Sequence, residues 1–228
     1  MAAPTVNTAN ESSLTTAGTS HTVSLPATVN AGDLLIVLFG HAVSATIDAL
    51  AGWNELVDDG ATNGVGVLWK RAVGNEDGTT ITLVTSAATK STHISYSITG
   101  ANNTTAPAIS TVATGTTNAP DPTTCNPGTS KDRLWITFFV GAGEELDDDT
   151  WCNNAATGYG SLLQKASGTG GLPATNCTIA SCVRTATAAS EDAAWPAAST
   201  DQVLGWRAHT IGIQAGGGIF SAGSYYKA

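Results

Sequence analysis

Short stretches in which apolar side chains recur at every second position constrain this chain most. Residues 81–83 and 94–98 alternate apolar with polar side chains, so each would present one apolar face as a β-strand. Residues 34–39 and 134–140 are apolar almost throughout, which indicates strands buried on both faces. Turn-forming Gly, Asn and Asp separate these stretches, for example at 74–78. The pattern predicts an all-β protein, an antiparallel β-sandwich.

The composition agrees with a single β domain. Of the 228 residues, 42% are hydrophobic and only 12% are charged. The charged share is about half of the roughly 25% that is usual in globular domains. Thr, Ser and Asn therefore supply much of the polar surface, as in many β-rich proteins. We expect one sandwich domain at residues 19–214.

The charge excludes two classes of partner. The net charge is −9 and the nine basic residues are scattered, so no basic stripe could neutralise a nucleic-acid backbone or bind an anionic membrane. The N-terminus lacks the basic and apolar regions of a secretory signal. The densest apolar run, 34–39, is too short to span a bilayer. We expect a soluble protein made in the host cytoplasm, with no nucleic-acid or membrane partner.

The two halves of the chain, 32–100 and 131–213, contain a similar series of elements. Each begins with an apolar strand after an Asp, continues through a loop with a Trp (Trp53 or Trp151), and then has a strand ending near a Lys. A Thr-rich strand and a closing apolar strand follow in both halves. This series predicts two similar half-cores in one domain. We expect the Thr-, Pro- and Asn-rich connection at 102–130 to run extended over the surface.

Both ends of the chain are predicted to be arms. Residues 1–18 are polar and have no strong period, which favours an N-terminal arm. Residues 215–228 begin with a run of Gly and then carry a few large apolar side chains. A flexible hinge before such side chains suits a docking tail, in which the interface residues would be Ile219, Phe220, Tyr225 and Tyr226. The alternative is a disordered or self-packed tail.

No motif of a catalytic or metal site is present. Residues 158–161 have the wrong order for a nucleophile elbow, and 168–171 lack the Lys of a phosphate loop. The four histidines lie on separate segments, so we expect no enzyme, no cofactor and no metal. The acidic run 144–149 could attract calcium, but it lacks the D-x-D-x-D-G spacing and is better explained as a solvated loop tip.

The cysteines and tryptophans leave alternatives open. Two disulfides could form among the four cysteines, with three connectivities, or all four could be buried thiols; the residues are Cys125, Cys152, Cys177 and Cys182. The spacing of Cys177 and Cys182 would direct them to opposite faces of a regular strand. Trp53 and Trp151 lie where loops meet strands and are the candidate glycan platform, whereas Trp residues inside strands are expected in the core.

A family resemblance adds to this interpretation. It rests on residues 23–37, 52–56, 68–72, 78–83 and 96–100, which share an outline of Pro-Ala, Gly-Asp-Leu-Leu, Gly-Trp, a Lys-Arg-Ala strand end, a Thr-rich strand and Tyr-x-x-x-Gly. This outline resembles tailed-bacteriophage virion structural proteins with a jelly-roll-like β-sandwich, of the capsid decoration or fibre type. The resemblance implies a jelly-roll-like fold and a place in the virion.

The resemblance implies a structural function. We expect a decoration or cement protein that stabilises the phage head through contacts with the major capsid protein or other virion proteins. It would act as a homo-oligomer, with a trimer favoured. The alternative is a tail-fibre or adhesin module that binds host-surface glycan. A hydrolase is a third hypothesis, which would require a His beside an acidic or Ser group in a pocket.

Overall fold

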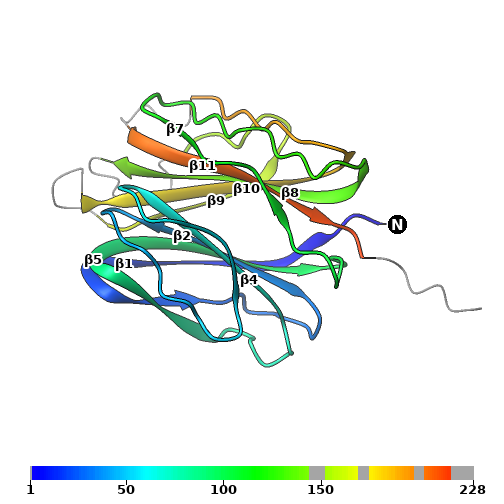
Figure 1. The fold of residues 1–228 in the computed structure, drawn as a ribbon, viewed down its shortest axis with the longest axis horizontal. Helices are drawn as coiled ribbons and strands as arrows, with labels where there is room; N and C mark the ends of the chain where they lie inside the picture. Colours follow the sequence, from blue (N-terminus) through cyan, green and yellow to red (C-terminus); the bar gives the residue numbers. More distant parts are fainter. Residues whose placement is uncertain (1, 144–151, 169–174, 198–202, 217–228) are drawn as a thin grey trace, which may run out of the picture.

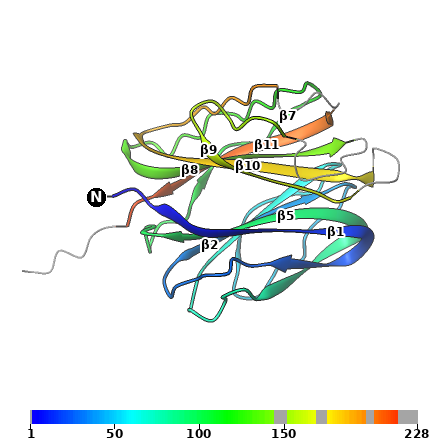
Figure 2. The ribbon, with the colours of Figure 1, turned by 180° about the vertical axis from the view of Figure 1, so that it is seen from behind.

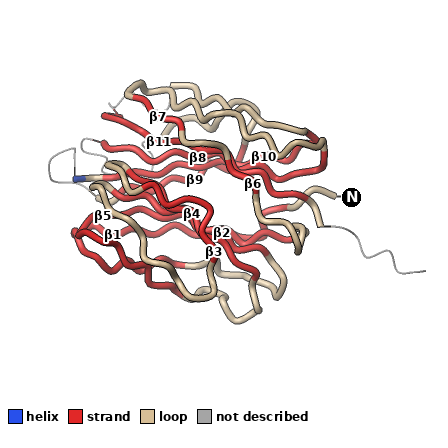
Figure 3. Tube along the Cα trace, viewed as in Figure 1, coloured by secondary structure: helices blue, strands red, loops and turns tan. Residues whose placement is uncertain are grey.

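The computed structural model describes residues 2–143, 152–168, 175–197 and 203–216. Within these ranges, eleven strands form two antiparallel sheets that pack face to face (Figures 1 and 3). The prediction of an all-β sandwich is therefore confirmed. The strand order does not by itself define a jelly roll, so that part stays a prediction. No helix in the described ranges is long and apolar enough to cross a membrane.

Each sheet is built from one half of the chain. The first sheet has the order β1-β5-β2-β4-β3, and the second has the order β6-β11-β8-β10-β9, with β7 also paired to β11. The strands of the first sheet are β1 (Thr5–Ser24), β2 (Leu34–His41), β3 (Asn54–Asp59), β4 (Gly64–Arg71) and β5 (Thr80–Thr99). Those of the second are β6 (Ala108–Ile109), β7 (Ala113–Gly115), β8 (Lys131–Gly143), β9 (Gly160–Ala166), β10 (Cys177–Ala188) and β11 (Val203–Gln214).

The two sheets share one strand order. The order β5-β2-β4-β3 in the first sheet corresponds position by position to β11-β8-β10-β9 in the second. This is the arrangement that a duplicated unit would give. The correspondence differs in detail from that predicted from the sequence, which matched the Lys-ended strand β4 with residues 159–165. Those residues contribute to β9, which lies in the position of β3, whereas β10 lies in the position of β4.

The N-terminal residues belong to the first sheet. The prediction of an arm at 1–18 is wrong, because β1 begins at Thr5 and pairs with β5 from Thr5↔Thr99 onward. The strand lies at the edge of the sheet and is rich in half-exposed Thr, Asn and Ser side chains. Backbone pairing holds such a strand without an apolar face, so no hydrophobic period reveals it in the sequence.

The main core lies between the sheets and is shared by both halves. Leu34, Ile36 and Leu38 of β2 point into it, as do Ile136 and Phe138 of β8. All five are buried. The two predicted half-cores are therefore faces of one core, because each sheet alone leaves an apolar face that only the other sheet covers.

The outer faces of both sheets are covered as well. On the first sheet, Leu35, Val37 and Phe39 of β2 join an outer cluster with Val23 and Leu83. On the second sheet, Phe139 of β8 packs against Trp195 and Trp206 on the corresponding outer face. Burial on both sides explains why the stretches at 34–39 and 134–140 are apolar at consecutive positions.

Part of the cover on the first sheet is a continuation of the sheet itself. Strands β1 and β5 are long and change register between Leu14 and Ser20, where β1 bends back (Figure 2). After the bend, residues 18–24 pair with 80–89, and the backbone amide of Ser24 donates to Ser12 Oγ at 3.1 Å. We call residues 18–24 and 80–89 the folded-back layer.

Candidate functional site at the terminal end

The two ends of the described chain meet at one end of the sandwich (Figure 1). A Cβ on Gly100 would lie 3.7 Å from Pro4 Cα, and the backbone amide of Gly216 donates to the Gly100 carbonyl at 2.7 Å. We call this region the terminal end. It contains the start of the predicted docking tail at Gly216, so it is the place at which the tail would act.

Both sheets hold the root of this tail. Ala215 donates its amide to the carbonyl of Asp132 in β8 at 3.1 Å. Asn102, just after β5, donates to the carbonyl of Gln214 at 2.9 Å. Because these bonds reach one sheet and then the other, residues 214–216 hold a fixed position between the two sheets.

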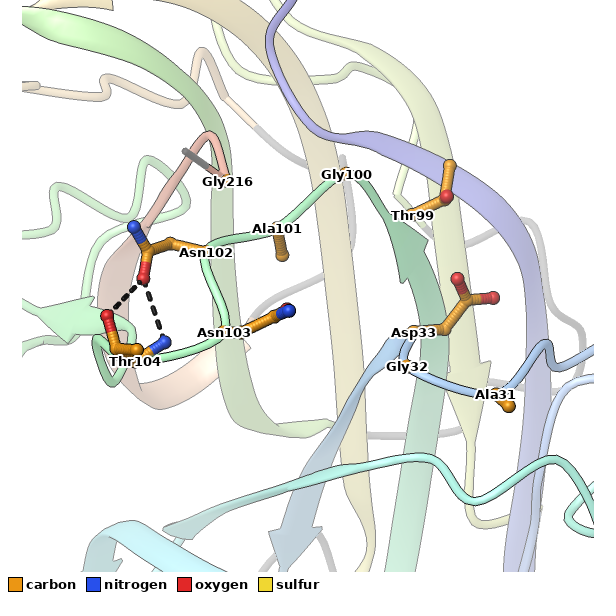
Figure 4. Close-up of a pocket in the computed structure, with 10 residues that line it drawn as sticks. All are labelled: Ala31, Gly32, Asp33, Thr99, Gly100, Ala101, Asn102, Asn103, Thr104 and Gly216. Carbon is orange, nitrogen blue, oxygen red and sulfur yellow. Dashed lines mark hydrogen bonds between the residues drawn. The ribbon is translucent and has the colours of Figure 1, made fainter. Parts of the chain in front are cut away.

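Two shallow hollows lie at the root of the tail. The larger, of about 640 Å³, is drawn in Figure 4 and has a lining of small and polar residues: Ala31, Gly32, Asp33, Thr99, Gly100, Ala101, Asn102, Asn103, Thr104 and Gly216. The smaller, of about 390 Å³, is lined by Ser130, Lys131, Asp132, Thr187, Gln214 and Ala215. Segment 214–216 contributes to both.

The wall of the larger hollow is held by a buried carboxylate. Asp33 is 5% exposed, and its Oδ2 accepts hydrogen bonds from Ser97 Oγ at 2.8 Å and from the Asn30 amide at 3.0 Å. These bonds fix the 30–33 turn against β5. Opposite, Asn102 Oδ1 accepts from the amide of Thr104 at 2.9 Å (Figure 4) and from the amide of Thr105 at 3.0 Å, which orders the loop after β5.

A cation connects the two loops that form this hollow. Arg71 of β4 donates to the Asn102 carbonyl and, at 3.5 Å, to the Gly32 carbonyl. Burial lowers the pKa of Arg71 from its ordinary value, and the nearby Asp33 opposes that shift. The lining residues include no His, Cys or Lys. The hollow therefore offers hydrogen-bonding groups and one carboxylate, that of Asp33, which is already bound by Ser97 and Asn30.

Several predicted site residues fall outside the described ranges. They are Trp151, the acidic run 144–149 and the tail residues Ile219, Phe220, Tyr225 and Tyr226. Trp53 is half-buried against the outer cluster of the first sheet, and Lys70 Nζ lies 5.8 Å from the centre of its ring. One face of this candidate glycan platform is thus already in contact with a cation.

The four cysteines are buried free thiols, which is the second of the two alternatives. Burial raises the pKa of Cys125 and Cys152 to about 11, and that of Cys177 and Cys182 to about 12, so none is a ready nucleophile. Cys177 Sγ contacts the Gly40 carbonyl of the first sheet, whereas Cys182 belongs to the outer cluster of the second. The opposite orientation predicted from their spacing is therefore confirmed.

The fold brings three of the four histidines together, which the sequence did not predict. His21 and His93 lie around Phe39, at 5.2 and 5.0 Å between ring centres, and His41 lies 6.0 Å from the same ring. His21 belongs to the folded-back layer, and none of the three histidines lines a described hollow. His209 lies on β11 of the second sheet. Among the described residues, no cluster of His, Cys, Asp or Glu could hold a metal ion.

These features define an antiparallel β-sandwich protein with one sheet from each half of the chain and with both described ends at one pole. Comparisons with protein-family models, with curated proteins and with solved structures found no match.

Proposed function

We propose that this chain is a structural protein of a tailed-phage virion that decorates the capsid and stabilises the head through the major capsid protein. The observation that carries the proposal is the terminal end, where the last described residues, 214–216, are bonded to both sheets and line two shallow hollows. A decoration protein needs a firm body and a segment that reaches a neighbour.

The reach of the tail suits such a bridge. Residues 217–228 could extend at most about 40 Å from Gly216, at roughly 3.4 Å per residue. That distance is comparable with the width of a small domain. Tyr225 and Tyr226 are of a residue type that is enriched among interface hot spots, and Phe220 is of a type enriched at interfaces; Ile219 would add apolar area. The hollows at the root would receive polar groups of the capsid surface, and a homo-oligomer, with a trimer favoured, would engage several such contacts at once.

The test is reconstitution on phage heads that lack this protein. The full chain should co-sediment with the heads and give density on the capsid lattice by cryo-electron microscopy. A variant with Phe220→Ala, Tyr225→Ala and Tyr226→Ala should bind at least about tenfold more weakly, because tenfold is about 1.4 kcal/mol and a single interface hot spot, a class enriched in Tyr, costs about 2 kcal/mol or more. Val84→Ala is the matched control, since Val84 is 40% exposed and pairs with Ser20 beside the bend of β1, away from Thr5 and Thr99 at the terminal end.

Two results would contradict the proposal. Failure of the full chain to bind the heads would remove the decoration function. Density at the tail tip or on a fibre would instead favour the host-recognition alternative, for which glycan binding that depends on Trp53 and Trp151 would be the next measurement.

A further inference from the structure

A buried chain of hydrogen bonds runs beneath the folded-back layer. His21 Nε2 lies 2.8 Å from Thr85 Oγ1, and His21 Nδ1 lies 2.7 Å from Ser91 Oγ. The same Ser91 hydroxyl is 2.8 Å from His93 Nε2, and His93 Nδ1 is 2.9 Å from Ser12 Oγ. The chain connects the folded-back parts of β1 and β5 to the parts that lie in the sheet.

The donor and the acceptor of every hydrogen bond in this chain can be assigned by starting at Thr85. Thr85 Oγ1 is 2.9 Å from the Ala87 carbonyl, which can only accept, so the Thr85 hydroxyl donates there. A hydroxyl has one proton, so Thr85 must accept from His21 Nε2–H. A neutral imidazole that donates at Nε2 accepts at Nδ1, so His21 Nδ1 accepts from the Ser91 hydroxyl.

The same logic assigns the rest of the chain. Ser91 has used its proton on His21, so it must accept from His93 Nε2–H, and His93 Nδ1 must accept from the Ser12 hydroxyl. Ser12 in turn accepts from the Ser24 amide. Each donor and acceptor in this chain has a partner, and both rings are neutral with the proton on Nε2.

The surroundings do not compensate a positive charge on either ring. Phe39 packs against both imidazoles. The titratable group near them on β2 is His41, which is positive when protonated and therefore disfavours a positive charge on His21. Of the charged residues on the neighbouring parts of β1 and β5, Glu11 binds the amide of Gln164 at 2.8 Å and Lys90 binds Asn176 at 2.7 Å.

Burial accordingly lowers the pKa of both rings. The pKa of His21 falls to about 4, with a further lowering from His41, and that of His93 falls to about 3, with a further lowering from His21. Both rings are therefore neutral at neutral pH, as the directions of their hydrogen bonds require.

An added proton would break the chain as well as introduce a charge. On His21 it would occupy Nδ1, so Ser91 would receive two N–H donors and its own proton would lose its acceptor. On His93 it would occupy Nδ1 and displace the Ser12 hydroxyl proton. A buried donor without an acceptor destabilises the folded state, more so if it is charged. If the folded-back layer separates from the sheet, both rings become exposed to water and can bind the proton without this cost.

We propose that this chain of hydrogen bonds is an acid-sensitive latch, whose protonation at His21 and His93 releases the folded-back layer from the outer face of the first sheet. Release exposes an apolar surface that includes Leu35, Val37 and Phe39, which this layer covers in the closed state. The inference concerns the isolated chain and does not depend on capsid decoration.

The sign and size of the effect follow from proton linkage. Both folded-state pKa values lie below the ordinary 6.5, so the opened state binds more protons below pH 6.5 and opening becomes more favourable as pH falls. At pH 5 each histidine raises the opening constant by about thirtyfold relative to pH 7.5, and both together by about a thousandfold. The factor is insensitive to the native pKa as long as that value lies well below 5.

Hydrogen exchange of the full chain, followed by mass spectrometry at pH 7.5 and pH 5, tests the latch. After correction for intrinsic exchange rates, peptides of 18–24 and 80–89 should lose about a thousandfold of protection, more than peptides of β8 and β10. His21→Gln and His93→Gln should each reduce this pH effect to about thirtyfold, because one titrating ring remains. His209→Gln, a change of another buried histidine on the second sheet, should leave the thousandfold effect in the folded-back layer unchanged.

Equal loss of protection in both sheets, or a full pH effect in both single variants, would overturn the proposal. Should the glutamine variants fail to fold, imidazole nitrogen NMR of the unmodified chain decides instead. Both rings should be neutral with the proton on Nε2 from pH 7 down to about pH 5. An Nδ1–H tautomer, or a native ring that is protonated at pH 6, would exclude the latch.

Discussion

Gly64 shows how closely single residues are constrained at the end of the sandwich opposite the termini. A Cβ at this position would lie 2.2 Å from His41 Cε1 and 2.3 Å from the carbonyl oxygen of Asp59. The carbonyl belongs to the backbone and His41 is buried, so neither can move aside at low cost. The glycine is required by close approach of two chain segments, which a sequence pattern does not reveal.

Gly64→Ala should therefore lower the free energy of unfolding by about 1–3 kcal/mol, the usual cost of overpacking. Gly160→Ala is the matched control, since nothing lies within 4 Å of its Cβ position, and it should change stability little. Urea unfolding followed by tryptophan fluorescence measures both variants. Equal stability of the two would contradict the close contact at Gly64.

At the scale of elements, β1 is the part whose role the sequence concealed. Its first half supplies the edge of the first sheet, and its second half covers the outer face of that sheet. Polar edge residues carry no hydrophobic period, so the strand is predicted as an arm. The sequence also did not show that β9 holds the same place in the second sheet as β3 in the first. Similarity between two segments is local, whereas the place of a strand in a sheet depends on its hydrogen-bonded neighbours.

Truncations distinguish the two ends. Deletion of residues 2–14 should abolish cooperative unfolding or lower Tm by well over 10 °C, because it exposes the paired edge of β5 from 91 to 99 and removes Ser12. Deletion of 217–228 keeps the bonds of Ala215 and Gly216, so it should leave Tm unchanged within a few degrees. Thermal unfolding by circular dichroism compares the two; a stable chain without 2–14 would restore the arm interpretation.

At the scale of the whole molecule, acid should weaken the fold. Burial lowers the pKa of all four histidines, which are His21, His41, His93 and His209. Each contributes stability that is present above pH 6.5 and is lost as pH falls toward its native pKa. Burial raises the pKa of Glu76, but Lys70 and the amides of 73–75 outweigh that effect and bring it to about 2, so its contribution is lost below about pH 4.5.

The free energy of unfolding should therefore decrease by up to about 4 kcal/mol between pH 7.5 and pH 5 from His21 and His93 alone, at 1.36 kcal/mol per pKa unit. Urea midpoints at pH 7.5, 6 and 5 check this. The double variant His21→Gln, His93→Gln should show a flatter profile. A midpoint that is constant across this range would mean that the rings are protonated without cost.

The sequence by itself determined the apolar strands around 34–39 and 134–140, the turn at 74–78 and the sandwich class, because the period-two alternation and the Gly, Asn and Asp residues act locally. It also determined that Cys177 and Cys182 face opposite ways, since side chains alternate along any strand. Only the tertiary structure decided which strands neighbour each other and where the two ends of the described chain meet. It alone placed Ser12 against both Ser24 and His93, because such contacts join segments far apart in the chain and depend on register and on the bend in β1.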